Sequence, residues 1–228
     1  MPRLSVILPC YNEARTLPEI VRRVRATARA HEIIAVDDGS TDASAAALVE
    51  LSRAPGAPLT LLRHARNRGK GAAIRTGLAA VTGDLVLVQD ADLEYDPAAY
   101  AALVAPFADS TVQAVYGSRN LHPNPRSTPA FYWGGRFLSW FANVLYGSRV
   151  TDISTGYKVV RTDVLRALPL AADGFEFCEE VTALLLRRGV RIREVPISYV
   201  PRTRAEGKKI RARDGVIAIA TLIRLRWK

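Results

Sequence analysis

The alternation of short apolar segments with amphipathic ones is the feature that most constrains the fold of this chain. Mostly apolar segments of strand length occur at residues 4–8, 32–36, 59–63, 85–89 and 112–116. Segments with apolar residues at helical spacing lie between them, at residues 16–29, 44–51, 70–81 and 98–107. This alternation predicts an α/β fold with a doubly wound, mainly parallel sheet flanked by helices.

The alternation ends after Arg119. Residues 120–129 contain three prolines and no periodicity, which predicts a mobile loop. Further helices are expected at residues 136–146, 178–188 and 214–228, and short strands at residues 191–195 and 197–200. No repeat or linker divides the sequence, so we expect a single domain over residues 1–228.

Composition and charge restrict the partners of the protein. The 228 residues carry a net charge of +10, which favours nucleotides, lipid phosphates or an acidic membrane surface. The basic stretches 63–75 and 202–213 lack interleaved aromatic residues and recognition motifs, which argues against nucleic-acid binding. No apolar run reaches the roughly 20 residues of a membrane-spanning helix, and Cys10 and Cys178 are interpreted as reduced cysteines. We expect a cytoplasmic protein with at most peripheral membrane contact, and its oligomeric state is open.

Polar side chains follow the ends of the predicted strands, at residues 9–13, 37–40, 90–92 and 117–119. In doubly wound sheets, ligands bind beyond the carboxyl ends of the strands, so we expect a binding site there. Dinucleotide, P-loop and nucleophile-elbow motifs are absent, and the histidines at 31, 64 and 122 lack zinc-ligand spacing.

Asp90 and Asp92 alternate directly after a predicted buried strand, and Glu94 follows at the same spacing. Carboxylates suit a hard cation such as Mg²⁺ or Mn²⁺, which substrate phosphates usually complete. A D-x-D motif alone also fits a polar turn before a helix. Its place after the fourth strand, with Asp37 and Asp38 closing the second, favours the metal site.

Four motifs in order resemble the family 2 glycosyltransferases with a GT-A fold: SVILPCYNE at 5–13, VDDGSTD at 36–42, NRGKG at 67–71 and QDADLE at 89–94. Within that family, the sequence GSR at 117–119 and the later basic segment are similar to the dolichyl- and polyprenyl-phosphate mannose or glucose synthases. The resemblance covers nearly the whole chain. It implies an inverting, metal-dependent transfer of a hexose from GDP-mannose or UDP-glucose to a polyprenyl or dolichyl phosphate.

The resemblance also implies that successive parts of the chain have different functions. Residues 1–119 would bind the nucleotide-sugar, residues 120–213 the acceptor, and residues 214–228 would form an amphipathic helix. The donor is expected to meet Pro9, Tyr11, Glu13, Asp37, Asp38, Lys70, Asp90, Ala91 and Lys209. The metal is expected on Asp90, Asp92 and Glu94, and the acceptor phosphate on Arg119, Arg136 and Arg204. Asp92 and Arg119 are thus catalytic candidates, and residues 207–209 resemble a basic loop that closes over the donor.

Two chemistries remain open for the acceptor. A lipid phosphate is already anionic and needs positive charge rather than a general base. A hydroxyl on a glycan, protein or small molecule needs a carboxylate base, for which Glu179 and Glu180 are the candidates. Glu180 better matches the family position and is the third catalytic candidate. The helix dipole is an alternative reason for glutamates in a first helical turn.

Many lipid-phosphate glycosyltransferases carry C-terminal transmembrane helices, and this sequence shows none. The basic segment 201–213 and the amphipathic tail are expected to lie on an acidic membrane surface, or the tail packs on the core with its arginines in water.

Overall fold

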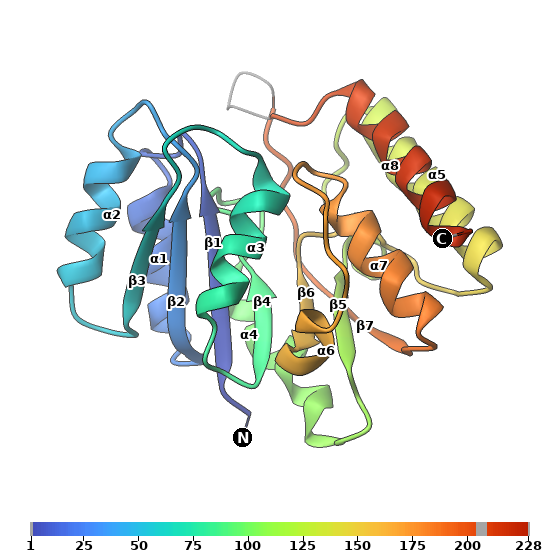
Figure 1. Ribbon diagram of the computed structural model, residues 1–228, viewed down its shortest axis with the longest axis horizontal. Coiled ribbons are helices and arrows are strands. Elements are labelled where there is room, and N and C mark those ends of the chain that lie inside the picture. Colours follow the sequence, from blue (N-terminus) through green and yellow to red (C-terminus); the bar gives the residue numbers. More distant parts are fainter. Residues whose placement is uncertain (1, 204–208, 228) are drawn as a thin grey trace.

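The structure, a computed structural model, describes residues 2–203 and 209–227. Within these residues, seven strands form a single sheet in the order β3-β2-β1-β4-β6-β5-β7 (Figure 1). The strands are β1 Leu4–Cys10, β2 Ala30–Asp37, β3 Leu59–Arg63, β4 Leu85–Val88, β5 Ala114–Ser118, β6 Lys158–Arg161 and β7 Ile192–Pro196. The helices are α1 Leu17–Ala26, α2 Ser44–Arg53, α3 Lys70–Ala80, α4 Tyr100–Val104, α5 Pro129–Tyr146, α6 Thr162–Arg166, α7 Phe177–Arg187 and α8 Ala212–Arg226. Short 3₁₀ turns add η1 Pro97–Ala99, η2 Ala105–Ala108 and η3 Arg119–Leu121.

The sheet is mostly parallel, which confirms the predicted α/β class. Strands β3, β2, β1 and β4 run parallel, and β5 and β7 are parallel to each other. Strand β6 is antiparallel to both β4 and β5, and so it joins the two parallel groups. The parallel strands of the first group therefore end at one edge of the sheet, where the polar segments after β1, β2 and β4 meet.

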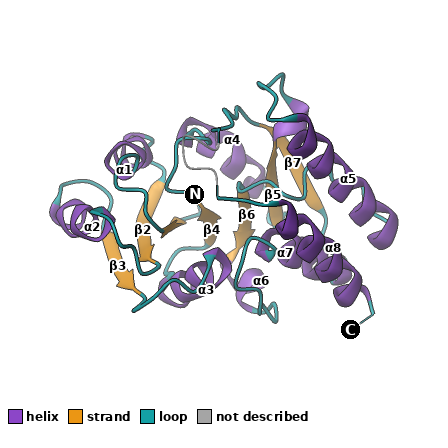
Figure 2. Cartoon of the chain, turned by 90° about the horizontal axis from the view of Figure 1, so that it is seen from above, coloured by secondary structure: helices purple, strands orange, loops and turns teal. Residues whose placement is uncertain are grey.

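Side chains that alternate along β1 explain why helices cover both faces of the sheet (Figure 2). Leu4, Val6 and Leu8 pack in one apolar cluster with the buried side of α1. Ile7 points to the opposite face, where it packs in a second cluster with Ile74 of α3. A strand buried on both faces reads as a continuous apolar run, as the sequence of β1 does.

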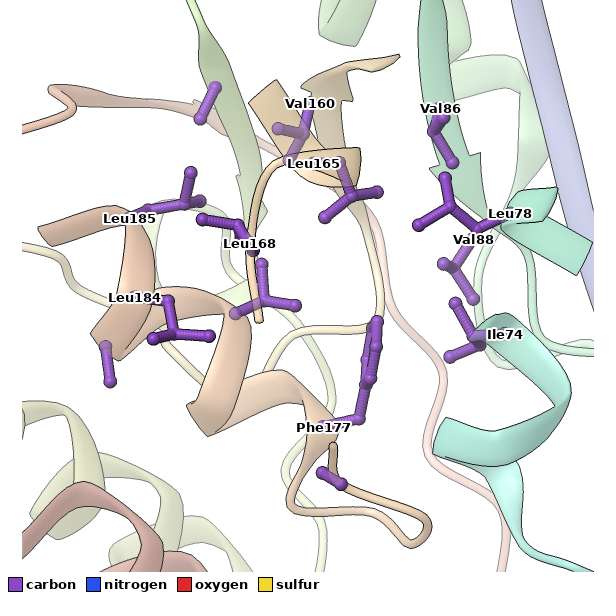
Figure 3. Packing of buried hydrophobic residues seen from close by; sticks show 14 of the residues in the cluster. Ile74, Leu78, Val86, Val88, Val160, Leu165, Leu168, Phe177, Leu184 and Leu185 are labelled. Carbon is purple, nitrogen blue, oxygen red and sulfur yellow. The ribbon is translucent and has the colours of Figure 1, made fainter. Parts of the chain in front are cut away.

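The second half of the molecule packs against the same core. Figure 3 shows Phe177, at the start of α7, in the space between Ile74 of α3 and Leu184 of α7. Helices α5 and α8 lie side by side at the outer edge (Figure 1). The Tyr146 hydroxyl donates to the Leu222 carbonyl at 2.7 Å, which ties these two helices together.

Several predicted elements differ from the observed ones. The helix expected at 98–107 is divided into η1, α4 and η2. Helix α4 gives way to η2 where Pro106 cannot donate the next helical hydrogen bond. Helix α5 starts at Pro129 rather than at residue 136, and the predicted loop before it opens with η3. Residues 197–200 form no strand but contribute one bridge, between Tyr95 and Tyr199. Strand β6 and helix α6 were not predicted.

Cys10 and Cys178 are both free. Among residues 2–203 and 209–227, no helix combines the length and the apolar character needed to cross a membrane.

Candidate active site

An acidic cluster, formed by Glu13, Asp90, Asp92 and Glu94, lies beyond the carboxyl ends of β1 and β4. Ile7 of β1 pairs with Val88 of β4, so the segments that follow the two strands lie next to each other. The Thr16 hydroxyl donates to the Ala91 carbonyl at 2.7 Å and joins the two segments. Glu13, after β1, and Asp92, after β4, are thereby held on either side of a shared space.

Arg202 occupies the space between these carboxylates. Its Nη1 donates to both Glu13 oxygens at 3.0 and 3.1 Å, and its Nη2 lies 3.0 Å from Asp92 Oδ2. Its backbone N–H donates to Glu94 Oε1 at 2.9 Å. The sequence indicated only that Arg202 belongs to a basic segment, because its partners lie up to 189 residues away in the chain.

Lys70 pairs with the remaining carboxylate of the cluster. Its Nζ lies 2.5 Å from Asp90 Oδ1. Burial opposes the charge of Lys70, but the charge and hydrogen bond of Asp90, together with Cys178 and Tyr95 nearby, raise the pKa of the ammonium group. Lys70, which is predicted to contact the donor, therefore lies against Asp90 of the acidic motif.

Burial and the nearby carboxylate of Asp90 make the ionised form of Asp92 unfavourable. Burial raises its pKa to about 7, and the neighbouring charge of Asp90 adds to the rise, whereas Arg202 lowers it. A divalent cation would relieve this repulsion, so the Asp90–Asp92 pair fits a Mg²⁺ or Mn²⁺ site.

Glu94, the third predicted metal ligand, has other partners. Its oxygens accept hydrogen bonds from the Tyr199 hydroxyl at 2.6 Å and from the backbone of Arg202. No three His, Cys, Asp or Glu side chains converge as a ready-made metal site in the part of the chain that the structure describes. In this structure Glu94 thus anchors the C-terminal segment through Tyr199 and Arg202, and it does not converge with Asp90 and Asp92 on one metal position.

Asp37 and Asp38, predicted to contact the nucleotide, are both buried and bonded within the protein. Asp38 accepts hydrogen bonds from the backbone of Arg68 and Gly69, and His64 Nδ1 lies 2.6 Å from its Oδ1. Asp37 accepts from the Ser40 backbone and pairs with Arg63. Asp38 therefore fixes the loop that leads into Lys70, and Asp37 links the turn at Ser40 to the end of β3. The sequence did not indicate these roles.

The remaining predicted donor residues surround the first strand. Pro9 lies within β1, and Tyr11 follows directly after it. Lys209 contacts the Tyr11 carbonyl, and its Nζ lies 2.6 Å from Glu13 Oε1. Lys209 thus joins Arg202 at the acidic cluster. Arg204, Gly207 and Lys208 lie outside the described residues.

Arg119 is held by a buried partner that the sequence did not reveal. Its Nε and Nη2 each lie 2.7 Å from an oxygen of Asp152, which forms a two-pronged pair. Burial would raise the pKa of Asp152, but the charge and hydrogen bonds of Arg119 hold it below its usual value. The ring of Tyr199 lies 5.0 Å from the Arg119 guanidinium carbon.

A cavity of about 190 Å³ opens beside this pair. Arg119, Arg126 and Arg136 line it, together with the side chains of Asn124 and Tyr199. The structure therefore brings Arg119 and Arg136, both predicted to meet the acceptor phosphate, to the same cavity. Arg126 was not predicted, because nothing in its local sequence distinguishes it from a surface arginine.

Glu180, the predicted base, has a structural role in this geometry. It is 1% exposed, and its oxygens accept hydrogen bonds from the backbone of Ala171 and Ala172 at 2.9 to 3.1 Å. Such a carboxylate is bound to backbone N–H groups rather than placed to take a proton from an acceptor. Glu179 is also buried, accepts from the Ser154 hydroxyl at 2.7 Å, and has a pKa raised by burial.

Comparisons with known proteins place the chain in a family. Residues 5–168 match the model of glycosyl transferase family 2. The chain is 30% identical over 210 residues to undecaprenyl-phosphate 4-deoxy-4-formamido-L-arabinose transferase of Enterobacter sp. (strain 638). That match covers 90% of this chain and 62% of the relative, so the chain spans under two thirds of that protein's length.

Solved structures with a GT-A glycosyltransferase fold superpose on nearly the whole chain. Glucosyl-3-phosphoglycerate synthase from Mycobacterium tuberculosis, in complex with phosphoglyceric acid, matches with a TM-score of 0.77 at 22% identity. The same enzyme with Mn²⁺, UDP-glucose and phosphoglyceric acid matches with a TM-score of 0.76 at 22% identity. Both alignments cover 99% of this chain and 80% of the other, and they establish the fold. With the family model matching most of its length, the chain belongs to glycosyl transferase family 2.

Proposed function

We propose that the protein transfers a sugar from a nucleoside-diphosphate sugar to the phosphate of a polyprenyl carrier. One observation carries the proposal: the acidic cluster and the arginine-lined cavity adjoin, with Tyr199 between them. Its hydroxyl donates to Glu94 of the cluster, and its ring lies against Arg119 of the cavity. A donor in the first site and an anionic acceptor in the second would meet at this residue.

The donor side combines carboxylates with the positively charged side chains of lysine and arginine residues. Bound Mg²⁺ or Mn²⁺ would be held by Asp90 and Asp92 and would neutralise the diphosphate leaving group. Lys70, Arg202 and Lys209 contact carboxylates of the cluster. Their positive charges would therefore lie beside a diphosphate that enters it. Pro9, Tyr11 and Ala91 would line the nucleotide pocket around them. The sugar is a hexose of GDP-mannose or UDP-glucose, or a modified arabinose as the curated relative's name suggests.

The acceptor side suits a phosphate better than a hydroxyl. A phosphate oxygen is anionic and can attack without a base, provided that cations hold it. Arg119, Arg126 and Arg136 supply those cations at one cavity, and Arg204 is a further candidate by its sequence position. The hydroxyl alternative would need a carboxylate base, and both oxygens of Glu180 are engaged by backbone N–H groups. A lipid acceptor would place the protein at the cytoplasmic face of a membrane.

A transfer assay in detergent micelles tests this function. The full chain is incubated with Mn²⁺ and each of several labelled nucleotide-sugars, with polyprenyl phosphate or the matching polyprenol as acceptor. We expect label only on the phosphorylated lipid. Arg136→Ala should raise the KM for the lipid by about tenfold or more, because a charge-assisted contact is lost.

The exposed Arg53 on α2 provides a matched control, since Arg53→Ala removes the same charge far from the cavity. Equal labelling of polyprenol, or transfer that Arg136→Ala and Arg53→Ala affect alike, would contradict the assignment of the cavity to an acceptor phosphate.

A further inference from the structure

Helix α5 presents a stripe of large apolar side chains to water. Trp133, Phe137, Trp140 and Val144 recur at spacings of four, three and four residues, and they are 47% to 66% exposed. This spacing places them on one side of the helix. The opposite side, which includes Ser139 and Ala142, is buried against the rest of the protein. A contiguous exposed stripe of this kind marks an interaction surface.

The charge around the stripe identifies the kind of partner. Residues 110–151 contain no Asp or Glu, whereas exposed arginines occur at 126, 136 and 149 in addition to Arg119, which is paired with Asp152. A second copy docking through the same face would bring arginines against arginines, which is unfavourable. An anionic surface would be complementary. Tryptophan is the residue that most favours the interfacial layer of a bilayer, and the stripe has two of them.

The stripe adjoins the arginine-lined cavity on the same helix. Phe131, Tyr132, Gly135 and Arg136 of α5 line the cavity, and Trp133 and Phe137 lie between or beside them in the sequence. One helix thus carries both surfaces at its N-terminal half. A surface that holds Trp133 and Phe137 would therefore lie next to the mouth of the cavity.

We propose that α5 docks on an anionic lipid bilayer, with Trp133, Phe137 and Trp140 inserted among the lipid headgroups. The arginine-lined cavity then opens at the depth of the lipid phosphates. A role for the cavity at that depth rests on the proposed transfer to a lipid phosphate, whereas the docking of α5 does not. An amphipathic helix with aromatic residues on one side and arginines nearby fits the interfacial plane of a bilayer.

Intrinsic fluorescence reports directly on this surface. The sequence contains three tryptophans, and the structure describes Trp133, Trp140 and Trp227 as 65%, 58% and 74% exposed. A protein with Trp140 alone is made by Trp133→Phe and Trp227→Phe, and one with Trp227 alone by Trp133→Phe and Trp140→Phe. Each full-length variant is titrated with phosphatidylcholine vesicles, with or without phosphatidylglycerol, that contain brominated lipid.

We expect Trp140 emission to shift to the blue and to be quenched by the brominated lipid when phosphatidylglycerol is present. Replacing both Trp133 and Phe137 with Ser should weaken vesicle binding, measured by co-sedimentation, at least about tenfold. Arg136→Ala should weaken it about fivefold, and the matched Arg53→Ala should not change it.

Quenching of Trp227 without Trp140 would overturn the assignment to α5. Equal binding with and without phosphatidylglycerol, or a Trp140 shift caused by concentration-dependent dimerisation in the absence of lipid, would also overturn it. Nucleotide-sugar and acceptor are left out of these titrations. A negative result here combined with transfer to polyprenyl phosphate in micelles would therefore refute the docking surface and leave the proposed function standing.

Discussion

Single residues of the candidate site were easier to predict than their partners. Asp90 and Asp92 come shortly after β4, and Arg119 directly follows β5. These positions, together with the ordered family motifs, marked them as site residues. Asp152 lies 33 residues after Arg119, in a segment with no regular element, and only the folded chain shows that the two form a buried pair. Sequence patterns report local periodicity, whereas ion pairs between distant segments depend on the tertiary fold.

The Arg119–Asp152 pair leads to a prediction about stability. Asp152 is 2% exposed, so Asp152→Ala would leave the Arg119 charge without its partner. We expect the free energy of unfolding to fall by about 3 kcal/mol, measured by urea denaturation at neutral pH. The control is Asp84→Ala, which breaks a half-exposed pair with Arg3 and should cost less than about 1 kcal/mol.

The same pair predicts a pH dependence. The pKa of Asp152 is lowered in the folded state, so its contribution is present above the unfolded-state pKa and is lost as the pH falls through the folded pKa. The stability gap between wild type and Asp152→Ala should therefore narrow in acid. Equal effects of the Asp152 and Asp84 variants at neutral pH would rule out a structural role for the pair.

At the scale of elements, the long periodic segments were predicted well and the short ones were not. Strands β1 to β4 and their helices follow the expected order, because each carries a clear apolar pattern. Strand β6 has four residues and α6 has five, which is too short for periodicity to distinguish them from a loop. Their omission hid the antiparallel strand that joins the two halves of the sheet.

Two helical glycines provide a prediction at this scale. Gly71 lies in the first turn of α3, where its N–H donates to the Gly174 carbonyl, and a Cβ added there would overlap the Ala172 carbonyl oxygen. We expect Gly71→Ala to lower the free energy of unfolding by about 1–3 kcal/mol, despite the better helix propensity of alanine. A Cβ on Gly134 of α5 would meet nothing within 4 Å.

Gly134→Ala is therefore the matched control, and it should raise the free energy of unfolding by about 0.5–1 kcal/mol. Urea denaturation of both variants provides the comparison. If both substitutions raise the free energy of unfolding, α3 does not pack as closely against residues 172–174 as the structure shows.

At the scale of the whole molecule, the C-terminal segment completes the site that the first strands begin. Arg202 and Lys209 reach Glu13 across 189 and 196 residues of sequence. The sequence indicated a basic segment and an acidic motif, but not that Arg202 would lie between Glu13 and Asp92. Family resemblance supplied the fold and the general position of the donor site, and the tertiary structure supplied the contacts that link it to the arginine-lined cavity.

We propose that the acidic cluster binds a nucleoside diphosphate together with a divalent cation. Titration calorimetry of UDP and of GDP, with and without Mn²⁺, tests it on wild type and on Asp92→Asn. We predict that one nucleotide binds with Mn²⁺, that its affinity falls at least about tenfold without the metal, and that Asp92→Asn produces a loss of similar size. Absence of binding by both nucleotides with Mn²⁺ present, or equal affinity of wild type and Asp92→Asn, would contradict the account.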